Sequence, residues 1–209
     1  YNRDKGIGVT VYLGQRKGHA STSDFSAAAL RETVEAALNI ARFTAEDPCA
    51  GLPEAGLLAT RDDCAVDLDL YHPWHIGVDQ SIELARRCEQ AAFAVSPLVS
   101  NSEGATVSIQ EGHFVAANSR GFMGGYPTSR HFVSCSVIAG KDDAMQRDDW
   151  YSTARDPRSI AAPEAIGDYA ARRALSRLGA RKIRTGKVPV LFEAPLAASL
   201  IGNFVHAAS

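Results

Sequence analysis

The sequence predicts an α+β protein in two lobes, and three observations favour this class. Residues 7–13 are β-branched and alternate between apolar and polar, as in a half-buried strand, while later segments repeat apolar residues at helical spacing. The expected strands and helices come in blocks, not in a regular β-α-β order. Residues 98–139 hold short alternating runs broken by glycine and asparagine, which is typical of an antiparallel β-meander. We therefore expect an N-terminal lobe over 1–96, and a lobe over 97–209 with the meander and further helices.

The N-terminal lobe is expected to open with the strand over 7–13, followed by a second short strand over 16–20. Ser26 suits the N-cap of a helix that runs to about Phe43, because its hydroxyl can accept from a free amide of the first turn. Residues 49–77 contain several glycines and prolines and are expected to be loop or irregular extended chain. A second helix is predicted over 79–95, with Asp79 as its N-cap.

The second lobe is expected to continue beyond the meander with a polar loop and more helices. Pro163 fits the first turn of a third helix, where a missing N–H costs nothing, and Gly179 fits the position just beyond its end. The other elements expected here are a loop over 140–149, a strand over 150–155, a helix over 163–178, a short buried strand over 188–192 and a helix over 196–208.

Composition excludes several classes of function. The formal net charge is −2 and the pI is near 6.3, and no basic face stands out, so direct binding to nucleic acid is disfavoured. No apolar run approaches the length of about 20 residues that a membrane span needs. The chain opens at Tyr1, directly before a strand, and stops at Ser209 within an apolar helical stretch, so we expect a fragment of a longer protein.

The cysteines predict no metal site. Cys49, Cys64, Cys88 and Cys135 form no CxxC pair, and their spacing matches no zinc pattern. Four reduced thiols in a cytoplasmic protein are expected, and a Cys49–Cys64 disulfide is the alternative.

The histidines and other reactive residues also predict no active site in this chain. His72 and His75 are three positions apart, but Pro73 between them opposes a helix, so a packed aromatic loop is favoured over a metal site. No HExxH or GxSxG pattern occurs. The last expected helix carries one histidine, His206, and no glutamate, and one imidazole cannot hold a catalytic zinc.

Several segments taken in order resemble one known family, the PmbA/TldD proteins, on the PmbA (TldE) side. The segments that carry the resemblance lie at residues 6–12, 16–22, 36–44, 46–52, 67–73, 118–121, 171–178 and 186–192. The resemblance implies that the chain is the N-terminal half of a protein about twice as long, without its first strand-helix unit and its C-terminal domain.

The resemblance also implies a function. TldD-type subunits of this family are zinc peptidases with an HExxxH helix, and PmbA-type subunits are their partners. The pair forms a chamber that digests unfolded peptides, with links to maturation of the peptide antibiotic microcin and to turnover of an antitoxin acting on DNA gyrase. The last helix here is similar to the metal helix. Gly202 and Asn203 stand where the first histidine and the glutamate would be, and Ala207 stands at the second histidine. We therefore expect no cofactor in this chain, and zinc in the TldD-type partner.

The expected function is that of a non-catalytic subunit that helps to bind peptide. Strand edges bind extended peptides through main-chain hydrogen bonds, so the glycine- and serine-rich meander is the expected contact surface. The candidate contact residues are Asn118, Ser119, Gly121, Gly125, Arg130 and His131. Two alternatives remain: a metallopeptidase in its own right with ligands in the missing half, and a scaffold that modulates DNA gyrase. We expect a cytoplasmic protein, which forms a homodimer when the TldD-like partner is absent.

Overall fold

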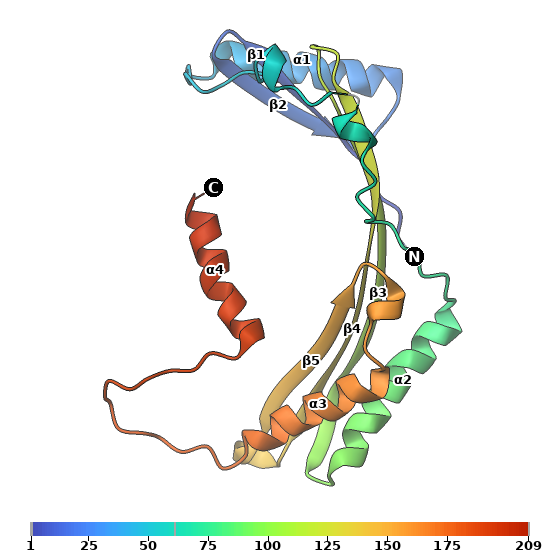
Figure 1. Ribbon diagram of the computed structural model, residues 1–209, viewed down its shortest axis with the longest axis vertical. Helices are drawn as coiled ribbons and strands as arrows, with labels where there is room; N and C mark the ends of the chain where they lie inside the picture. Colours follow the sequence, from blue (N-terminus) through green and yellow to red (C-terminus); the bar gives the residue numbers. More distant parts are fainter. Residues whose placement is uncertain (1, 61, 209) are drawn as a thin grey trace. The chain divides into compact units, whose positions relative to one another are not determined.

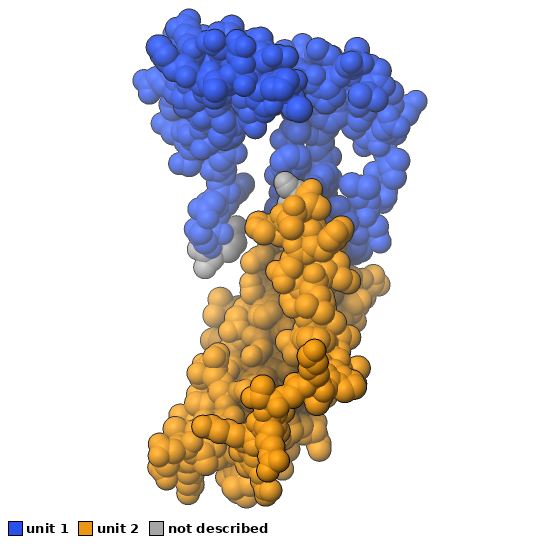
Figure 2. Space-filling view, turned by 90° about the vertical axis from the view of Figure 1, so that its left-hand side faces the viewer, with its two compact units in different colours: residues 1–72, 111–129 blue, residues 73–110, 130–209 orange. Residues whose placement is uncertain are grey.

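The computed structural model describes residues 2–60 and 62–208, and its elements are labelled in Figure 1. The chain divides into two compact units (Figure 2). Unit 1 holds residues 1–72 and 111–129, and unit 2 holds residues 73–110 and 130–209. The expected division at residues 96 and 97 does not coincide with these units, because the long strands β3 (Val99–Ala117) and β4 (Met123–Ala139) each contribute residues to both.

Unit 1 begins with an antiparallel hairpin covered by a helix, as expected. Strand β1 (Ile7–Leu13) pairs with β2 (Arg16–Thr22), and Leu13 lies opposite Arg16. Gly14 has a φ of +63°, which suits the first central position of a two-residue hairpin turn. Helix α1 (Ala27–Phe43) follows, and the Ala29 amide donates to the Ser26 hydroxyl at 3.3 Å, so the predicted N-cap is confirmed.

The helix packs directly on the backbone of β2 at a glycine. A Cβ atom on Gly18 would collide with the Ala37 carbonyl oxygen and lie 2.5 Å from the Ala41 nitrogen. Ala37 and Ala41 are fully buried at this contact. Small residues on both sides therefore allow α1 to approach the hairpin closely.

The rest of unit 1 is the irregular chain after α1 and the distal part of the β3–β4 hairpin. Apart from short 3-10 turns at Ala55–Leu57 and Asp63–Ala65, residues 44–60 and 62–72 are irregular, as predicted. It is tied to β4 at Ser129, whose amide donates to the Leu70 carbonyl at 2.9 Å and whose hydroxyl accepts from the His72 amide at 2.8 Å.

Unit 2 is a sheet with two helices on one face. The strand order is β3-β4-β5, with β5 spanning Gln146–Ala154. Helices α2 (Val78–Val95) and α3 (Pro163–Ser176) cover the face on which alternate residues of β4 are buried (Figure 1). The core they enclose is built largely from alanine and valine with two cysteines; its members are Cys88, Ala92, Val99, Val133, Cys135, Val137, Ala139, Ile166, Ala170, Ala171 and Ala174.

The structure corrects four expectations. The expected antiparallel meander is confirmed by the order β3-β4-β5, but β3 and β4 are long strands and not several short ones, because Gly104, Gly112 and Gly125 lie within strands. Strand β5 begins at Gln146, inside the expected loop. Helix α2 starts one residue early, since Gly77 is the N-cap and its amide donates to the Gln80 side chain at 2.8 Å. Residues 188–192 form no strand and are exposed, because no described strand lies beside them to pair with.

Helix α3 begins at Pro163, so the predicted role of Pro163 is confirmed. The helix ends at Ser176 with Arg177 as its C-cap, two residues earlier than expected, and Gly179, with a φ of +73°, lies two residues beyond that cap. The last helix, α4 (Ala194–Ala208), also forms as predicted, but it contains no buried residue. Its large apolar side chains are more than half exposed: Leu196, Leu200, Ile201, Phe204 and Val205. No helix of the described chain is both long and apolar enough to cross a membrane.

Candidate functional site

A groove of about 2330 Å³ lies within unit 1, between β1 and the distal part of β3. Residues 6–12 of β1 and its approach form one wall, and residues 111–120 of β3 and the following turn form the other. Four aromatic side chains, Tyr12, Phe25, Tyr71 and Phe114, line the groove together with charged residues of both signs. The combination of apolar surface and polar main chain suits an extended polypeptide better than a compact ion.

Both strands that border the groove lie at sheet edges. Within the described chain β1 pairs only with β2, and β3 is the outer strand of the order β3-β4-β5. In an antiparallel pair, every second residue directs its N–H and C=O away from the partner strand. Because Leu13 and Arg16 close the two-residue turn, Gly8, Thr10 and Tyr12 are the residues whose main chain faces the open edge.

Side chains around the groove are held by polar contacts. The Tyr71 hydroxyl donates to Glu111 Oε2 at 3.1 Å, and this hydrogen bond to a carboxylate raises the pKa of Tyr71 above its ordinary value. Thr10 Oγ1 and His19 Nδ1 lie 3.0 Å apart across the hairpin. Arg120 donates from Nη1 to the Pro53 carbonyl at 2.6 Å, which ties the turn to the loop after α1. These contacts fix the shape of the groove wall.

The structure brings together only part of the predicted contact set. Asn118 and Ser119 line the groove, and the Asn118 side chain accepts from the Arg120 amide at 2.9 Å, which shapes the turn. Gly121 lies in the same turn with a φ of +88°, and Gly125 packs against the Phe114 carbonyl across the hairpin. These four residues belong to unit 1.

The other two predicted contact residues lie in unit 2. Arg130 is exposed and donates to Thr153 Oγ1 at 3.4 Å. His131 is fully buried and lies edge-on to Trp74 with ring centroids 5.5 Å apart, so it is a core residue and not part of an exposed surface. Sequence reasoning missed the open edge of β1. The order of two strands followed by a helix was a signal for this edge in the sequence, because a two-stranded hairpin leaves the outer side of its first strand unpaired.

The residues expected to match a metal helix lie on α4, and all are exposed. Gly202, Asn203 and Ala207 supply no carboxylate and no imidazole, and His206 stands about 100° around the helix from Ala207. No group of three or more His, Cys, Asp or Glu side chains in the described residues is arranged to hold a metal ion. His72 contacts Asp69, with Nε2 3.2 Å from Oδ1, while His75 is exposed.

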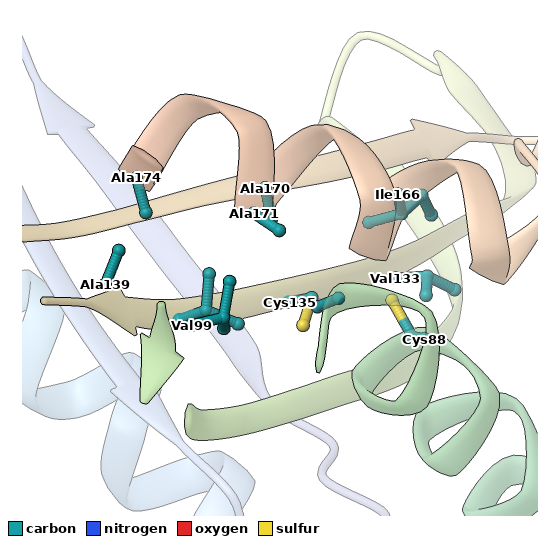
Figure 3. Close-up of a cluster of buried hydrophobic side chains, with 11 residues drawn as sticks. Cys88, Val99, Val133, Cys135, Ala139, Ile166, Ala170, Ala171 and Ala174 are labelled. Atoms are coloured by element: carbon teal, nitrogen blue, oxygen red, sulfur yellow. The ribbon is translucent and has the colours of Figure 1, made fainter. Parts of the chain in front are cut away.

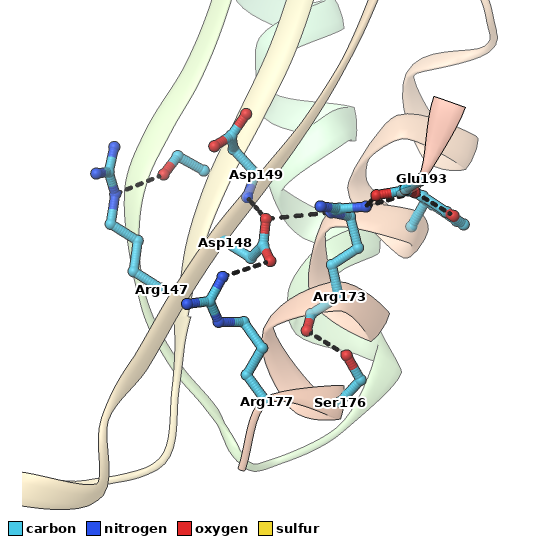
Figure 4. A network of polar contacts seen from close by, with 9 residues as sticks. Arg147, Asp148, Asp149, Arg173, Ser176, Arg177 and Glu193 are labelled. Atoms are coloured by element: carbon cyan, nitrogen blue, oxygen red, sulfur yellow. Dashed lines mark hydrogen bonds and ion pairs between the residues drawn. The ribbon is translucent and has the colours of Figure 1, made fainter. Parts of the chain in front are cut away.

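A charged network holds the residue that precedes α4 (Figure 4). Arg173 of α3 donates to Glu193 Oε2 at 2.6 Å and to Asp148 Oδ1 of β5 at 3.1 Å. Its guanidinium also lies over the Trp150 ring, 5.1 Å from the centroid. The hydrogen bonds to Glu193 and Asp148 raise the pKa of Arg173. The start of α4 is thereby fastened to the α3 layer.

The fold defines a class known from solved structures. A protein named as a modulator of DNA gyrase from Bacteroides thetaiotaomicron superimposes with a TM-score of 0.75 at 21% identity, over 87% of this chain and 41% of that one. A similarly named protein from Thermotoga maritima gives 0.68 at 20% identity, over 88% and 40%. TldE from Thermococcus kodakarensis gives 0.59 at 15% identity, over 81% and 42%. The chain has the fold of this class.

Sequence comparison identifies the family. The model of the PmbA/TldA metallopeptidase central domain matches residues 71–178, and that of domain 1 matches residues 1–41. Metalloprotease PmbA of Escherichia coli O157:H7 is 44% identical over 99% of this chain, and its Haemophilus influenzae homologue is 41% identical over all of it. The chain belongs to the PmbA/TldD family. It spans less than half the length of these relatives, 45% and 46% respectively.

The family name implies a metal, and the described residues do not fit one. A catalytic zinc needs three protein ligands, commonly two imidazoles with a third nitrogen, oxygen or sulfur donor, around an open position for water. The α4 positions expected from the resemblance to match the metal helix, Gly202, Asn203 and Ala207, offer an amide and two residues without donor side chains. No chemical step through a metal is therefore assigned to these residues.

Proposed function

We propose that this chain is part of a PmbA-type subunit that pairs with a TldD-like zinc metallopeptidase and binds unfolded peptide without supplying the metal. The observation that supports the proposal is the composition of α4: at Gly202, Asn203 and Ala207, the positions expected to match the metal helix of TldD-type subunits, it carries no metal ligand. The likeness to TldE and to PmbA metalloproteases supports a role within a peptidase system. Microcin precursors and unfolded antitoxins are substrates that such a complex would take, and a cytoplasmic location suits both.

The groove of unit 1 supports the peptide-binding part of this proposal. An extended peptide laid along β1 would pair with the outward main-chain groups of Gly8, Thr10 and Tyr12. Main-chain pairing tolerates many side chains, which suits a chamber that accepts unfolded substrates. Aromatic residues such as Tyr12 and Phe114 would add contacts to alternate side chains of the peptide.

The function is tested by hydrolysis of a flexible reporter peptide. Three samples are compared: the full-length protein alone, a TldD-type metallopeptidase subunit alone, and their mixture. Cleavage in the mixture only, abolished by a zinc chelator, is the expected result. Chelator-sensitive cleavage by this protein alone would overturn the proposal and indicate a metal site outside the described residues. Equal cleavage by the TldD-type subunit with and without this protein would show that the peptidase does not need this protein as a partner, and would contradict the proposal.

The groove is tested by a single main-chain change. Thr10→Pro removes the outward amide of β1, while Thr10→Val keeps that amide and removes only the hydroxyl that contacts His19. We expect Thr10→Pro to raise the Km of the mixture for the reporter peptide by about 5- to 20-fold, and Thr10→Val to change it less than 2-fold. If both variants raised the Km equally, the loss of peptide binding would come from the Thr10 side chain, and main-chain pairing of the peptide with β1 would be excluded.

A further inference from the structure

The densest run of basic residues in the chain lies in unit 2, in the segment that follows α3. Residues 181–187, which we name the basic arm, include the four cations Arg181, Lys182, Arg184 and Lys187. All seven residues of the arm are exposed, and they form neither helix nor strand. No acidic residue occurs from 169 to 192, so the positive charge of the arm is not balanced locally in the sequence.

The packing of α3 makes no use of these charges. The side of the helix that faces the core carries three alanines and an isoleucine (Figure 3), and the helix ends at Ser176. A cation stabilises the negative end of a helix only within its last turn, and Arg173 already lies there. The basic arm lies beyond this turn, so the stability of α3 does not explain its charges.

The chain pairs many of its other arginines with carboxylates, whereas the arm has no such partner. The paired arginines are Arg16, Arg86, Arg87, Arg147, Arg158, Arg172, Arg173 and Arg177. The two acidic residues nearest to the arm in sequence are already paired, Asp168 with Arg172 at 2.7 Å and Glu193 with Arg173 at 2.6 Å. Within the described residues, the four cations of the arm form no ion pair and no side-chain hydrogen bond.

Four exposed cations in a row suit a polymer better than a single ion. Seven residues span at most about 25 Å when extended, whereas a single carboxylate or phosphate is held by donors that converge on it. Two observations favour an acidic polypeptide over a nucleic acid. The chain as a whole has a formal net charge of −2. Within the arm, the apolar side chain of Ile183 is 87% exposed between cations, where it can contact the apolar side chains of an unfolded peptide.

We propose that the basic arm binds acidic segments of unfolded peptides and so gives the peptidase complex a preference for acidic substrates. This inference rests on the proposed function, because it adds a substrate preference to the peptide binding described above. The attraction between exposed charges extends over about 10 Å in 0.1 M salt. The arm therefore raises the local concentration of acidic peptides around the complex.

Two reporter peptides test this preference in the mixture of the full-length protein and a TldD-type subunit. The peptides share their length and cleavage site, and four glutamates in one replace four glutamines in the other. At low salt, about 50 mM, we expect the Km of the glutamate peptide to be about 5- to 30-fold below that of the glutamine peptide. In about 300 mM salt the two Km values should differ less than about 2-fold, because salt screens exposed charges.

The position of the charges is tested with two variants of equal net charge. The arm variant carries Arg181→Gln, Lys182→Gln, Arg184→Gln and Lys187→Gln. The control variant removes four exposed cations outside the arm and carries Lys17→Gln, Arg31→Gln, Arg86→Gln and Lys141→Gln. We expect the arm variant to reduce the preference for the glutamate peptide to less than about 2-fold, and the control variant to retain the preference of the unmodified protein.

Failure of the arm and failure of the proposed function give different results. If the mixture cleaved neither peptide, the proposed function itself would be overturned. Cleavage of both peptides with equal Km values at low salt would overturn only the role of the arm, as would a preference that persists in the arm variant. If the arm variant does not fold, the salt series on the unmodified protein decides alone.

Two further measurements distinguish other ligands of the arm. The TldD-type subunit is titrated into each variant, with cleavage of the glutamine peptide as the readout. Weaker pairing of the arm variant would overturn the proposal and assign the arm to the interface between the subunits. A single-stranded oligonucleotide and a glutamate polymer of equal charge are then compared as inhibitors of cleavage. Stronger inhibition by the oligonucleotide would also overturn the proposal and assign the arm to nucleic acid.

Discussion

At the scale of single residues, two glycines set the closest approaches in the molecule. Gly18 lets α1 contact β2, and Gly167 lets α3 contact α2 at the Cys88 carbonyl. Neither has a positive φ, so neither is needed for a turn. The sequence offered no signal for either role, because each glycine stands inside an otherwise regular strand or helix, where glycine is unfavourable. The reason for each lies in a partner element that sequence periodicity does not identify.

We expect Gly167→Ala to lower the free energy of unfolding of unit 2 by about 2–4 kcal/mol. The added methyl group would meet the Cys88 carbonyl oxygen, which belongs to helix backbone and cannot rotate away. Urea unfolding followed by tryptophan fluorescence measures the loss. Gly202→Ala is the matched helical control: nothing lies within 4 Å of its Cβ, so stability should stay equal or rise by up to about 1 kcal/mol. If Gly167→Ala left the free energy of unfolding unchanged, α2 and α3 would be able to move apart without loss of stability, which would contradict the prediction.

At the scale of elements, helices were predicted more accurately than strands. The four long helices carry clear signals, such as Ser26 before α1 and Pro163 at the start of α3. The β3–β4 hairpin was predicted as several short strands, because glycines inside long, half-exposed strands resemble turn residues. In the candidate site, Asn118 and Ser119 were predicted from the sequence as contact residues, and the structure places them in the lining of the groove. The outward edge of β1 was not, because strand pairing is a tertiary property.

The network around Arg173 connects three elements, and its stability depends on pH. Burial alone would raise the pKa of Asp148, but the Asp149 amide and the guanidinium groups of Arg173 and Arg177 outweigh burial and lower it. A depressed pKa in the folded state stabilises the protein above the unfolded pKa near 3.8, and this contribution is lost as the pH falls through the folded value.

We expect Asp148→Asn to lower the free energy of unfolding by about 1–3 kcal/mol at pH 7, because Asp148 is mostly buried between two arginines. The difference from the unmodified protein should shrink as the pH falls below about 4 and Asp148 becomes protonated. Urea unfolding at a series of pH values measures it. The neighbouring Asp149→Asn, on an exposed side chain, serves as the control and should stay within about 0.5 kcal/mol. A difference independent of pH would exclude the charged network as its cause.

At the scale of the whole molecule, two compact units share two long strands. Each unit has its own helix-on-strand packing: α1 with β1 and β2 in unit 1, and α2 and α3 with the three-stranded sheet in unit 2. Both tryptophans of the chain, Trp74 and Trp150, lie in unit 2. Tryptophan fluorescence therefore reports unfolding of unit 2 alone, whereas far-UV circular dichroism reports helices of both units.

This separation makes Gly18→Ala a test of independence. The added methyl group would collide with the Ala37 carbonyl oxygen and should destabilise unit 1 by about 2–4 kcal/mol. If the units unfold separately, the urea midpoint seen by tryptophan fluorescence should not move, while amide exchange in α1 accelerates and an early loss of helix appears by circular dichroism. A shift of both midpoints together would instead mean that β3 and β4 transmit the loss along their length, so that the groove in unit 1 and the helix-covered sheet of unit 2 belong to one cooperative structure.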